Sequence, residues 1–167
     1  MFGDGALTFR EYVMNEPLPL AIVHRAVLDF LHHRDDAVLF GAQAVNAYVD
    51  QARMTQDVDI LSTRAPELAE EIRKHLNARF KIAARVRKVR QGLGYRIYQI
   101  QKSGNRHLVD VRPVESFPPN QRVDDVLVVS PAELIANKVA AFNHRRVRPR
   151  RLQTAATWRF YCFNFRT

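Results

Sequence analysis

The chain has 167 residues, which is about the length of one ordinary domain, and 47% of them are hydrophobic. This composition excludes a disordered chain, the single cysteine excludes an internal disulfide, and no apolar run reaches the roughly 18 residues of a membrane span. The net charge of +9 favours polyanionic partners such as nucleotide phosphates or nucleic acid, although a solvated arginine-rich surface would give the same charge. We therefore expect a single cytoplasmic domain over residues 1–167, with its core at about 20–146 and an atypical tail at 147–167.

Helices and two short strands are predicted in the first half of the chain. Apolar residues at helical spacing, or a helix-favouring composition, predict helices at 20 to about 34, 42–52 and 65–80. Short apolar runs next to turn residues predict strands at 37–40 and 57–62. Each of these strands therefore leads into a helix.

The second half of the chain predicts a group of strands and one long helix. Alternating apolar residues and intervening turns predict an antiparallel meander at 81–89, 95–102 and 107–114, followed by an edge strand at 123–130. Ser130, Pro131 and Glu133 have the order of an N-cap, a first helical residue and its capping partner. We expect a helix from there to residue 146, and an α+β fold class for the whole domain.

Two aspartates one residue apart, Asp57 and Asp59, stand in the second predicted strand. Residues i and i+2 of a strand point to the same face, with α-carbons about 6.5 to 7 Å apart. Two ionised carboxylates repel each other, and burial increases the penalty unless a cation lies between them. Because carboxylate oxygens suit Mg²⁺ or Mn²⁺, this pair predicts a divalent metal site.

A third carboxylate, Asp110, lies among apolar residues in the last strand of the predicted meander. If this strand lies beside the strand of Asp59, three carboxylates converge, which is enough to bind two metals about 3.5 to 4 Å apart. The alternative is that Asp110 only ends its strand, or pairs with Arg106 or Arg112.

Gly41 stands where the strand at 37–40 meets the following helix. A glycine at such a junction lets the backbone approach a phosphate closely, and the N–H groups of the helix point at it. Gly41, Ala42 and Gln43 are therefore candidates for phosphate binding. The alternative is that Gly41 only permits a tight turn.

The stretch at 39–61 resembles the nucleotidyltransferases of the DNA polymerase β superfamily, and most closely the minimal and abortive-infection-type bacterial enzymes. The resemblance lies in Gly41, in an R-x-T motif and in the D-x-D motif that follows it. The segment HLVDVRP is similar to the strand that carries their third aspartate. The segment SPAELIANKVAAFNHRR is similar to a later helix, whose lysine, here Lys138, faces the nucleotide phosphates. The resemblance covers about residues 39–151.

The resemblance implies a mixed, mostly antiparallel sheet with helices packed on one side. It implies metal-dependent transfer of a nucleoside monophosphate from an NTP to a hydroxyl of RNA, protein or a small molecule, and an antitoxin partner if the enzyme is a toxin. The implied catalytic and metal-binding residues are Asp57, Asp59 and Asp110, with Asp110 also helping to deprotonate the acceptor. The implied nucleotide-binding residues are Gly41, Ala42, Gln43, Arg53, Thr55 and Lys138.

Two departures from the family pattern leave a second hypothesis open. Ala42 stands where the family has a second glycine or a serine, so that no side-chain hydroxyl can contact a phosphate. The aromatic tail matches nothing expected after the last helix. The alternative to an active enzyme is a catalytically weakened module of the same fold that binds nucleic acid or a partner protein.

Overall fold

The computed structural model describes residues 18–89, 94–101 and 104–146, with side chains up to residue 143. The helices are α2 (Leu20–Leu31), α3 (Gly41–Asn46), α4 (Ala65–Phe80) and α5 (Pro131–Arg146). The strands are β1 (Ala37–Phe40), β2 (Val58–Ser62), β3 (Ala84–Lys88), β4 (Tyr95–Gln101), β5 (Gly104–Pro113), β6 (Asn120–Val123) and β7 (Val126–Val129). Among these residues, no helix combines the length and the apolar character that crossing a membrane requires. The tail at 147–167 lies outside the described residues.

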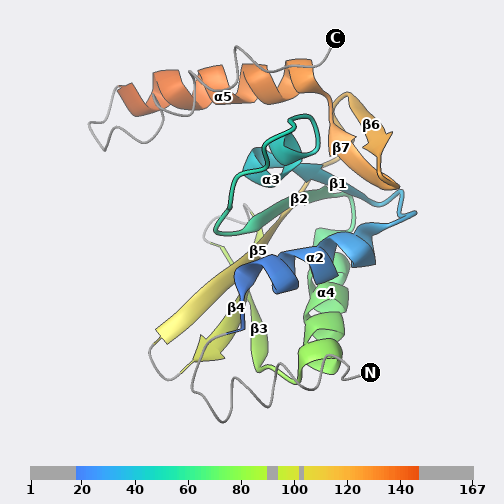
Figure 1. The fold of residues 1–167 in the computed structure, drawn as a ribbon, viewed down its shortest axis with the longest axis vertical. Coiled ribbons are helices and arrows are strands. Elements are labelled where there is room, and N and C mark those ends of the chain that lie inside the picture. Colours follow the sequence, from blue (N-terminus) through green and yellow to red (C-terminus); the bar gives the residue numbers. More distant parts are fainter. Residues whose placement is uncertain (1–17, 90–93, 102–103, 147–167) are drawn as a thin grey trace.

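A seven-stranded sheet with the order β3-β4-β5-β2-β1-β7-β6 forms the centre of the fold (Figure 1). The neighbours β1 and β7 are parallel, as are β2 and β5, and the other four neighbouring pairs are antiparallel. The predicted meander is present as β3, β4 and β5. The predicted α+β class with a mixed, mostly antiparallel sheet is confirmed.

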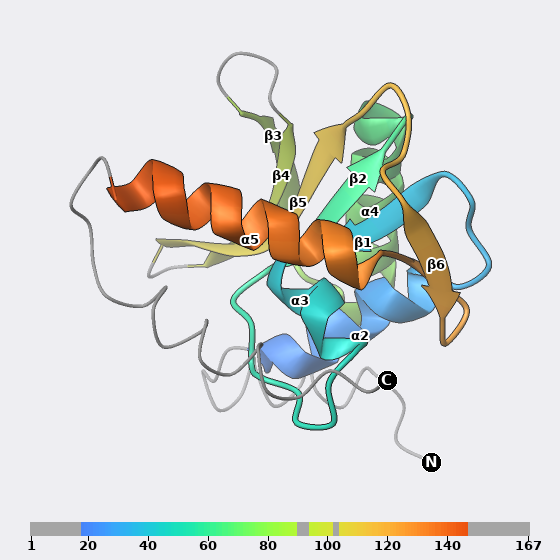
Figure 2. The same ribbon diagram turned by 90° about the horizontal axis from the view of Figure 1, so that it is seen from above.

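The helices α2 and α4 pack against each other and against one face of the sheet, whereas α5 lies next to α3 (Figures 1 and 2). The predicted apolar stripe of α4, which consists of Leu68, Ile72 and Leu76, is fully buried. In β2, Val58 and Ile60 are buried in the same core. Successive side chains of a strand point to opposite faces, so Asp59 faces away from this core.

Two predicted helices are longer than the observed ones. The helix predicted to about residue 34 ends at Leu31, and His33 then takes a φ of 58°, which a right-handed helix cannot contain. The helix predicted at 42–52 ends at Asn46. The Asn46 side chain donates to the carbonyl of Arg53 at 2.8 Å and accepts from its N–H group at 3.0 Å. These bonds close a loop that replaces the rest of the predicted helix.

The predicted strands differ from the observed ones at their ends and in one position. Strand β3 begins at Ala84, because Lys81 ends α4 in the left-handed conformation with a φ of 54°. Strand β5 begins at Gly104, before the predicted start at 107. The prediction of an edge strand at 123–130 is wrong: β7 lies between β1 and β6, and β6 is at the edge.

Candidate metal and nucleotide site

The pairing of β2 with β5 brings two of the predicted metal ligands side by side. These strands are parallel neighbours, and their register places Asp59 directly opposite Asp110. Asp57 stands immediately before β2, two residues from Asp59 and on the same face. The strand arrangement that the convergence of three carboxylates requires is therefore present.

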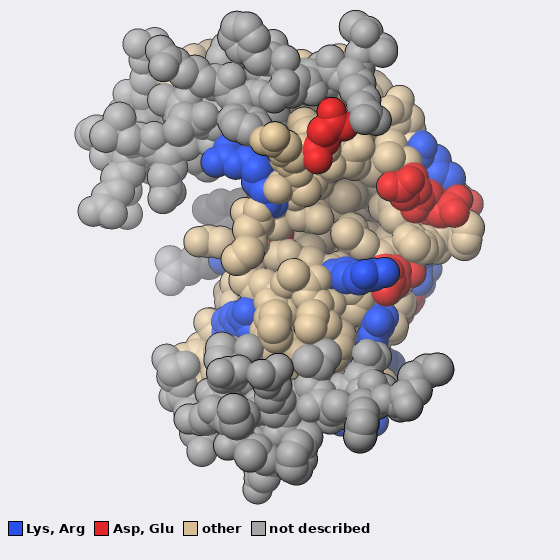
Figure 3. Space-filling view, viewed as in Figure 1, with Lys and Arg blue, Asp and Glu red and all other residues tan. Residues whose placement is uncertain are grey.

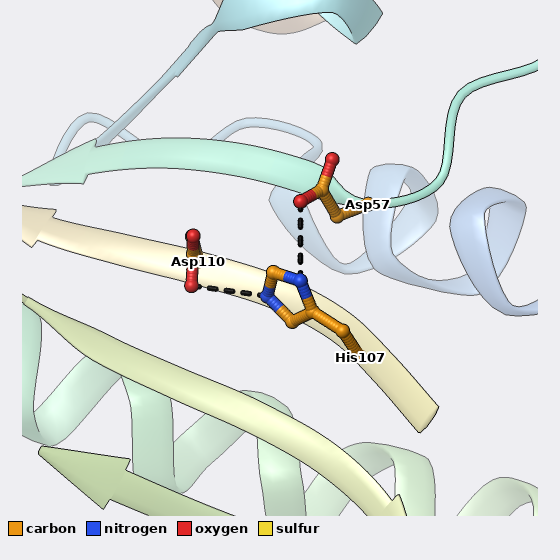
Figure 4. Close-up of side chains that lie close together, drawn as sticks. All are labelled: Asp57, His107 and Asp110. Atoms are coloured by element: carbon orange, nitrogen blue, oxygen red, sulfur yellow. Dashed lines mark hydrogen bonds and ion pairs between the residues drawn. The ribbon is translucent and has the colours of Figure 1, made fainter. Parts of the chain in front are cut away.

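Asp57 and Asp110 are joined by the imidazole ring of His107 (Figure 4). The ring Nδ1 lies 3.2 Å from Asp57 Oδ2, and Nε2 lies 3.0 Å from Asp110 Oδ1. One ligand atom from each of the three side chains lies within 4.8 Å of the other two. The three side chains are thus close enough together to surround one ion.

His107 reaches this cluster through a β-bulge in β5. At Tyr98 of β4 the pairing register shifts by one residue, so that Leu108 is an extra residue in β5. In a regular strand, residues three positions apart such as His107 and Asp110 would point to opposite faces. Strict alternation gave no reason to include His107 among the predicted site residues.

Arg96 of β4 holds Asp110 in place. Its Nε donates to Asp110 Oδ1 at 2.7 Å and its Nη2 donates to Oδ2 at 2.9 Å, which is the bidentate geometry of a strong arginine–carboxylate pair. Burial raises the pKa of Asp110, but hydrogen bonds from His107 and Arg96 outweigh burial and hold this pKa well below its usual range. Asp110 is therefore ionised at neutral pH, as a metal ligand has to be.

Asp59 has different surroundings. Its Oδ1 lies 3.8 Å from Arg112 Nη2, and its Oδ2 lies against Gly41, where an added Cβ would be only 2.2 Å away. Burial, followed by the negative charge of Asp57, raises the pKa of Asp59 to about 6. A bound cation would remove this penalty by favouring the ionised carboxylate, so the surroundings of Asp59 fit a metal site.

The residues predicted to bind phosphate through their backbone form the first turn of α3. Gly41 has a φ of 75°, a conformation that favours glycine, and Ala42 and Gln43 follow it in the helix. The hydroxyl of Thr55 is buried and donates to Gln43 Oε1 at 2.9 Å. Thr55 therefore fastens the loop before β2 to α3.

The two predicted phosphate-binding cations come from different elements. Arg53 is exposed on the loop after α3, and Asn46 holds its backbone. Lys138 is half-buried on α5, and its positive charge opposes part of the rise that burial and Asp57 cause in the pKa of Asp59. The helix of Lys138 contacts α3, which begins at Gly41 (Figure 2).

A hollow of about 330 Å³ opens beside Asp110, and its lining includes Tyr95 and Arg96 of β4 and Arg112 of β5. The guanidinium of Arg112 also lies 4.8 Å from the centre of the Phe40 ring. Tyr95 and Arg96 were not predicted to belong to the site. Arg112 was considered as a partner of Asp110, but Arg96 pairs with Asp110 and Arg112 lies 3.8 Å from Asp59 instead.

The family described as "Nucleotidyl transferase AbiEii toxin, Type IV TA system" matches residues 25–153. The chain belongs to this AbiEii family. The match spans every residue of the candidate site, from Gly41 to Lys138. The family resemblance seen in the glycine, R-x-T and D-x-D motifs is confirmed.

Two solved structures share the fold of this AbiEii chain. The Megavirus polyadenylate synthase is 14% identical over 81% of the chain, with a TM-score of 0.59, and JHP933 from Helicobacter pylori is 14% identical over 71%, with a TM-score of 0.52. At this identity the likeness concerns the fold alone. The chain spans 29% and 54% of the lengths of these two proteins. A comparison with curated proteins finds no match.

Proposed function

We propose that this AbiEii-family chain transfers a nucleoside monophosphate from an NTP to an acceptor hydroxyl, with Mg²⁺ or Mn²⁺ as cofactor. The observation that carries the proposal is the parallel pairing of β2 with β5, which sets Asp59 beside Asp110 next to the glycine that begins α3. Membership of a family of nucleotidyl transferase toxins supports the same activity.

Asp57, Asp59 and Asp110 would hold the metal. Their carboxylate oxygens are ligands that Mg²⁺ and Mn²⁺ accept, and the raised pKa of Asp59 reflects a crowded negative site that a cation would stabilise. When bound, the metal would stabilise the negative charge on the transferred phosphate and on the leaving pyrophosphate. The low pKa of Asp110 suits a metal ligand. Asp110 would help to remove the proton of the attacking hydroxyl by passing it on to solvent, because so weak a base does not keep a proton.

The first turn of α3 would bind the triphosphate. Gly41 has no side chain, so a phosphate could approach the backbone there, and the N–H groups of Ala42 and Gln43 would donate to it. Because Ala42 has no hydroxyl, this contact would be made by the backbone alone. Thr55 would contribute by holding Gln43.

Arg53 and Lys138 would neutralise the leaving group. In the reaction the acceptor oxygen forms a bond to the α-phosphorus, the bond from that phosphorus to the β-phosphate oxygen breaks, and pyrophosphate leaves. Negative charge grows on the departing oxygen, so cations beside it lower the barrier. The two residues lie on different elements and would approach the pyrophosphate from the loop and from α5.

Two kinds of macromolecular partner are proposed. A polyanionic acceptor such as RNA is supported by Arg85 and Arg87, which are exposed on β3. Figure 3 shows basic side chains at several places on one face of the molecule, with acidic side chains among them. An antitoxin is proposed as the protein partner from the family membership.

Transfer of label tests the proposed activity. The protein would be incubated with each NTP labelled at the α-phosphate, with Mg²⁺ or Mn²⁺ and with cellular RNA or lysate, beside an Asp57→Ala/Asp59→Ala double variant. Asp35→Asn is the matched control, because this aspartate is exposed and pairs with Arg122. We expect transfer by the wild type and the control, and none by the double variant. Equal transfer by wild type and double variant, or no transfer under any condition, would contradict the proposal.

A further inference from the structure

The His107 ring occupies a position between Asp57 and Asp110 that suits a metal ligand. Ligands of Mg²⁺ or Mn²⁺ lie about 2.1 Å from the ion, so adjacent ligands of an octahedral ion are about 3 Å apart and opposite ones about 4.2 Å apart. The ring nitrogens lie 3.2 Å from an oxygen of Asp57 and 3.0 Å from an oxygen of Asp110. Nδ1 makes the first of these contacts and Nε2 the second, so the ring has to rotate before a single nitrogen and two oxygens surround one ion; one ligand atom from each side chain already lies within 4.8 Å of the other two.

Asp59 does not share this arrangement. Among the described residues, the group of potential ligand atoms within 4.8 Å of one another consists of Asp57, His107 and Asp110. The Asp59 carboxylate instead lies against Gly41 and 3.8 Å from Arg112. Asp59 is thus on the side of the site next to α3, and His107 is on the side next to β4.

The surroundings of His107 hold its ring in this orientation. The β-bulge at Leu108 turns the side chain to the carboxylate face, and the Tyr98 ring lies beside it with 5.6 Å between the ring centres. Arg96 fixes Asp110 by both oxygens, in the way that outer hydrogen bonds orient metal-ligating carboxylates. A protonated His107 that only forms ion pairs with Asp57 and Asp110 would have the same geometry, so the experiment has to distinguish a coordinated ring from an ion-paired one.

We propose that His107 is a metal ligand together with Asp57 and Asp110, and that the site therefore binds Mn²⁺ in preference to Mg²⁺. Imidazole nitrogen suits first-row transition metals, whereas Mg²⁺ prefers a shell of oxygen atoms. The proposal rests on the proposed function only in requiring a divalent ion at these carboxylates. His107 would add a nitrogen ligand to the three-carboxylate site of the proposed function, on the side of that site away from Asp59.

Electron spin echo spectroscopy of Mn²⁺ bound to the full chain, without nucleotide, tests the proposal directly. The ¹⁴N nucleus of a coordinated imidazole modulates the echo, and a shell of oxygen ligands gives no such modulation. We expect the modulation in the wild type and in His33→Ala, whose histidine is exposed, and its loss in His107→Gln. In competition titrations the wild type should bind Mn²⁺ about tenfold or more tightly than Mg²⁺, and His107→Gln should lose most of this preference.

Wild-type protein alone can overturn the proposal, even if substitutions at His107 prevent folding. Absence of ¹⁴N modulation, or absence of Mn²⁺ binding, would do so, as would modulation that persists in folded His107→Gln. These outcomes are separable from those of the proposed function. Nitrogen modulation without any label transfer would contradict nucleotidyl transfer and leave His107 as a ligand, whereas label transfer without modulation would contradict only the role of His107.

Discussion

Replacement of Gly41 by alanine is expected to disturb the site through Asp59. A Cβ at residue 41 would lie 2.2 Å from Asp59 Oδ2 and 2.9 Å from its Cγ. Ordinary contacts between such atoms begin at about 3.5 Å, so the carboxylate has to move by about 1 Å or more. The φ of 75° adds a backbone cost of about 1 to 2 kcal/mol for any residue with a Cβ.

We expect Gly41→Ala to lower the free energy of unfolding by about 2 to 3 kcal/mol in urea denaturation, and to weaken Mn²⁺-dependent NTP binding about tenfold or more in calorimetry. Gly104→Ala is the matched control, because Gly104 also has a positive φ of 130° but an added Cβ would meet nothing within 4 Å. The control should lose stability and keep NTP binding. Folded Gly41→Ala that binds NTP as tightly as the wild type would refute the reasoning.

Three further substitutions test the electrostatics and the loop. In metal-free protein the Asp59 pKa of about 6 lies above its ordinary value of 3.8, so the buried charge of Asp59 lowers the free energy of unfolding progressively as the pH rises from about 4 to 6, with no further change above. The unfolding free energy of Asp59→Asn, measured in urea denaturation, should therefore rise relative to wild type by up to about 3 kcal/mol between about pH 4 and pH 6 and stay level above, and a pH-independent difference would contradict this. Arg96→Ala should lower the free energy of unfolding by about 1 to 3 kcal/mol in thermal unfolding at neutral pH, because ionised Asp110 loses its bidentate partner. Arg96→Lys should restore only part of this stability. An unchanged melting temperature in Arg96→Ala would disprove the importance of this pair. Asn46→Ala should lower the free energy of unfolding by about 1 to 2 kcal/mol and accelerate amide hydrogen exchange at Arg53. Unchanged exchange at Arg53 would show that Asn46 does not close the loop.

Elements with strong local signals could be predicted from the sequence. The Ser130 side chain accepts a hydrogen bond from the Glu133 N–H group at 3.5 Å, and α5 begins at Pro131 as the capping pattern indicates. The carboxylate pair also has a local signal, because alternation alone puts Asp57 and Asp59 on one face. The sequence could predict that Asp110 lies near Asp59 only if their two strands are neighbours in the sheet. It could not show that they are neighbours, since these strands are some 50 residues apart in the chain.

Features that depend on a tertiary irregularity could not be predicted. His107 joins the cluster because β5 contains an extra residue, and a single-residue bulge leaves no mark on the apolar pattern. The partner of Asp110 is Arg96, from a neighbouring strand, and many other arginines in this basic segment were equally plausible from sequence. The helix predicted at 42–52 ends early, at Asn46, because the Asn46 side chain bonds to Arg53, seven residues later, and helix propensity does not include such a contact.

A crystal structure of the protein with Mn²⁺ and an NTP analogue that cannot transfer its α-phosphate tests the central claim most directly. Anomalous scattering would locate the metal independently of the protein density. The account predicts an anomalous peak in contact with Asp57 and Asp110, with the triphosphate lying against the backbone of Gly41 at the start of α3. Absence of a peak at these carboxylates at saturating Mn²⁺, or a triphosphate bound away from α3, would contradict it.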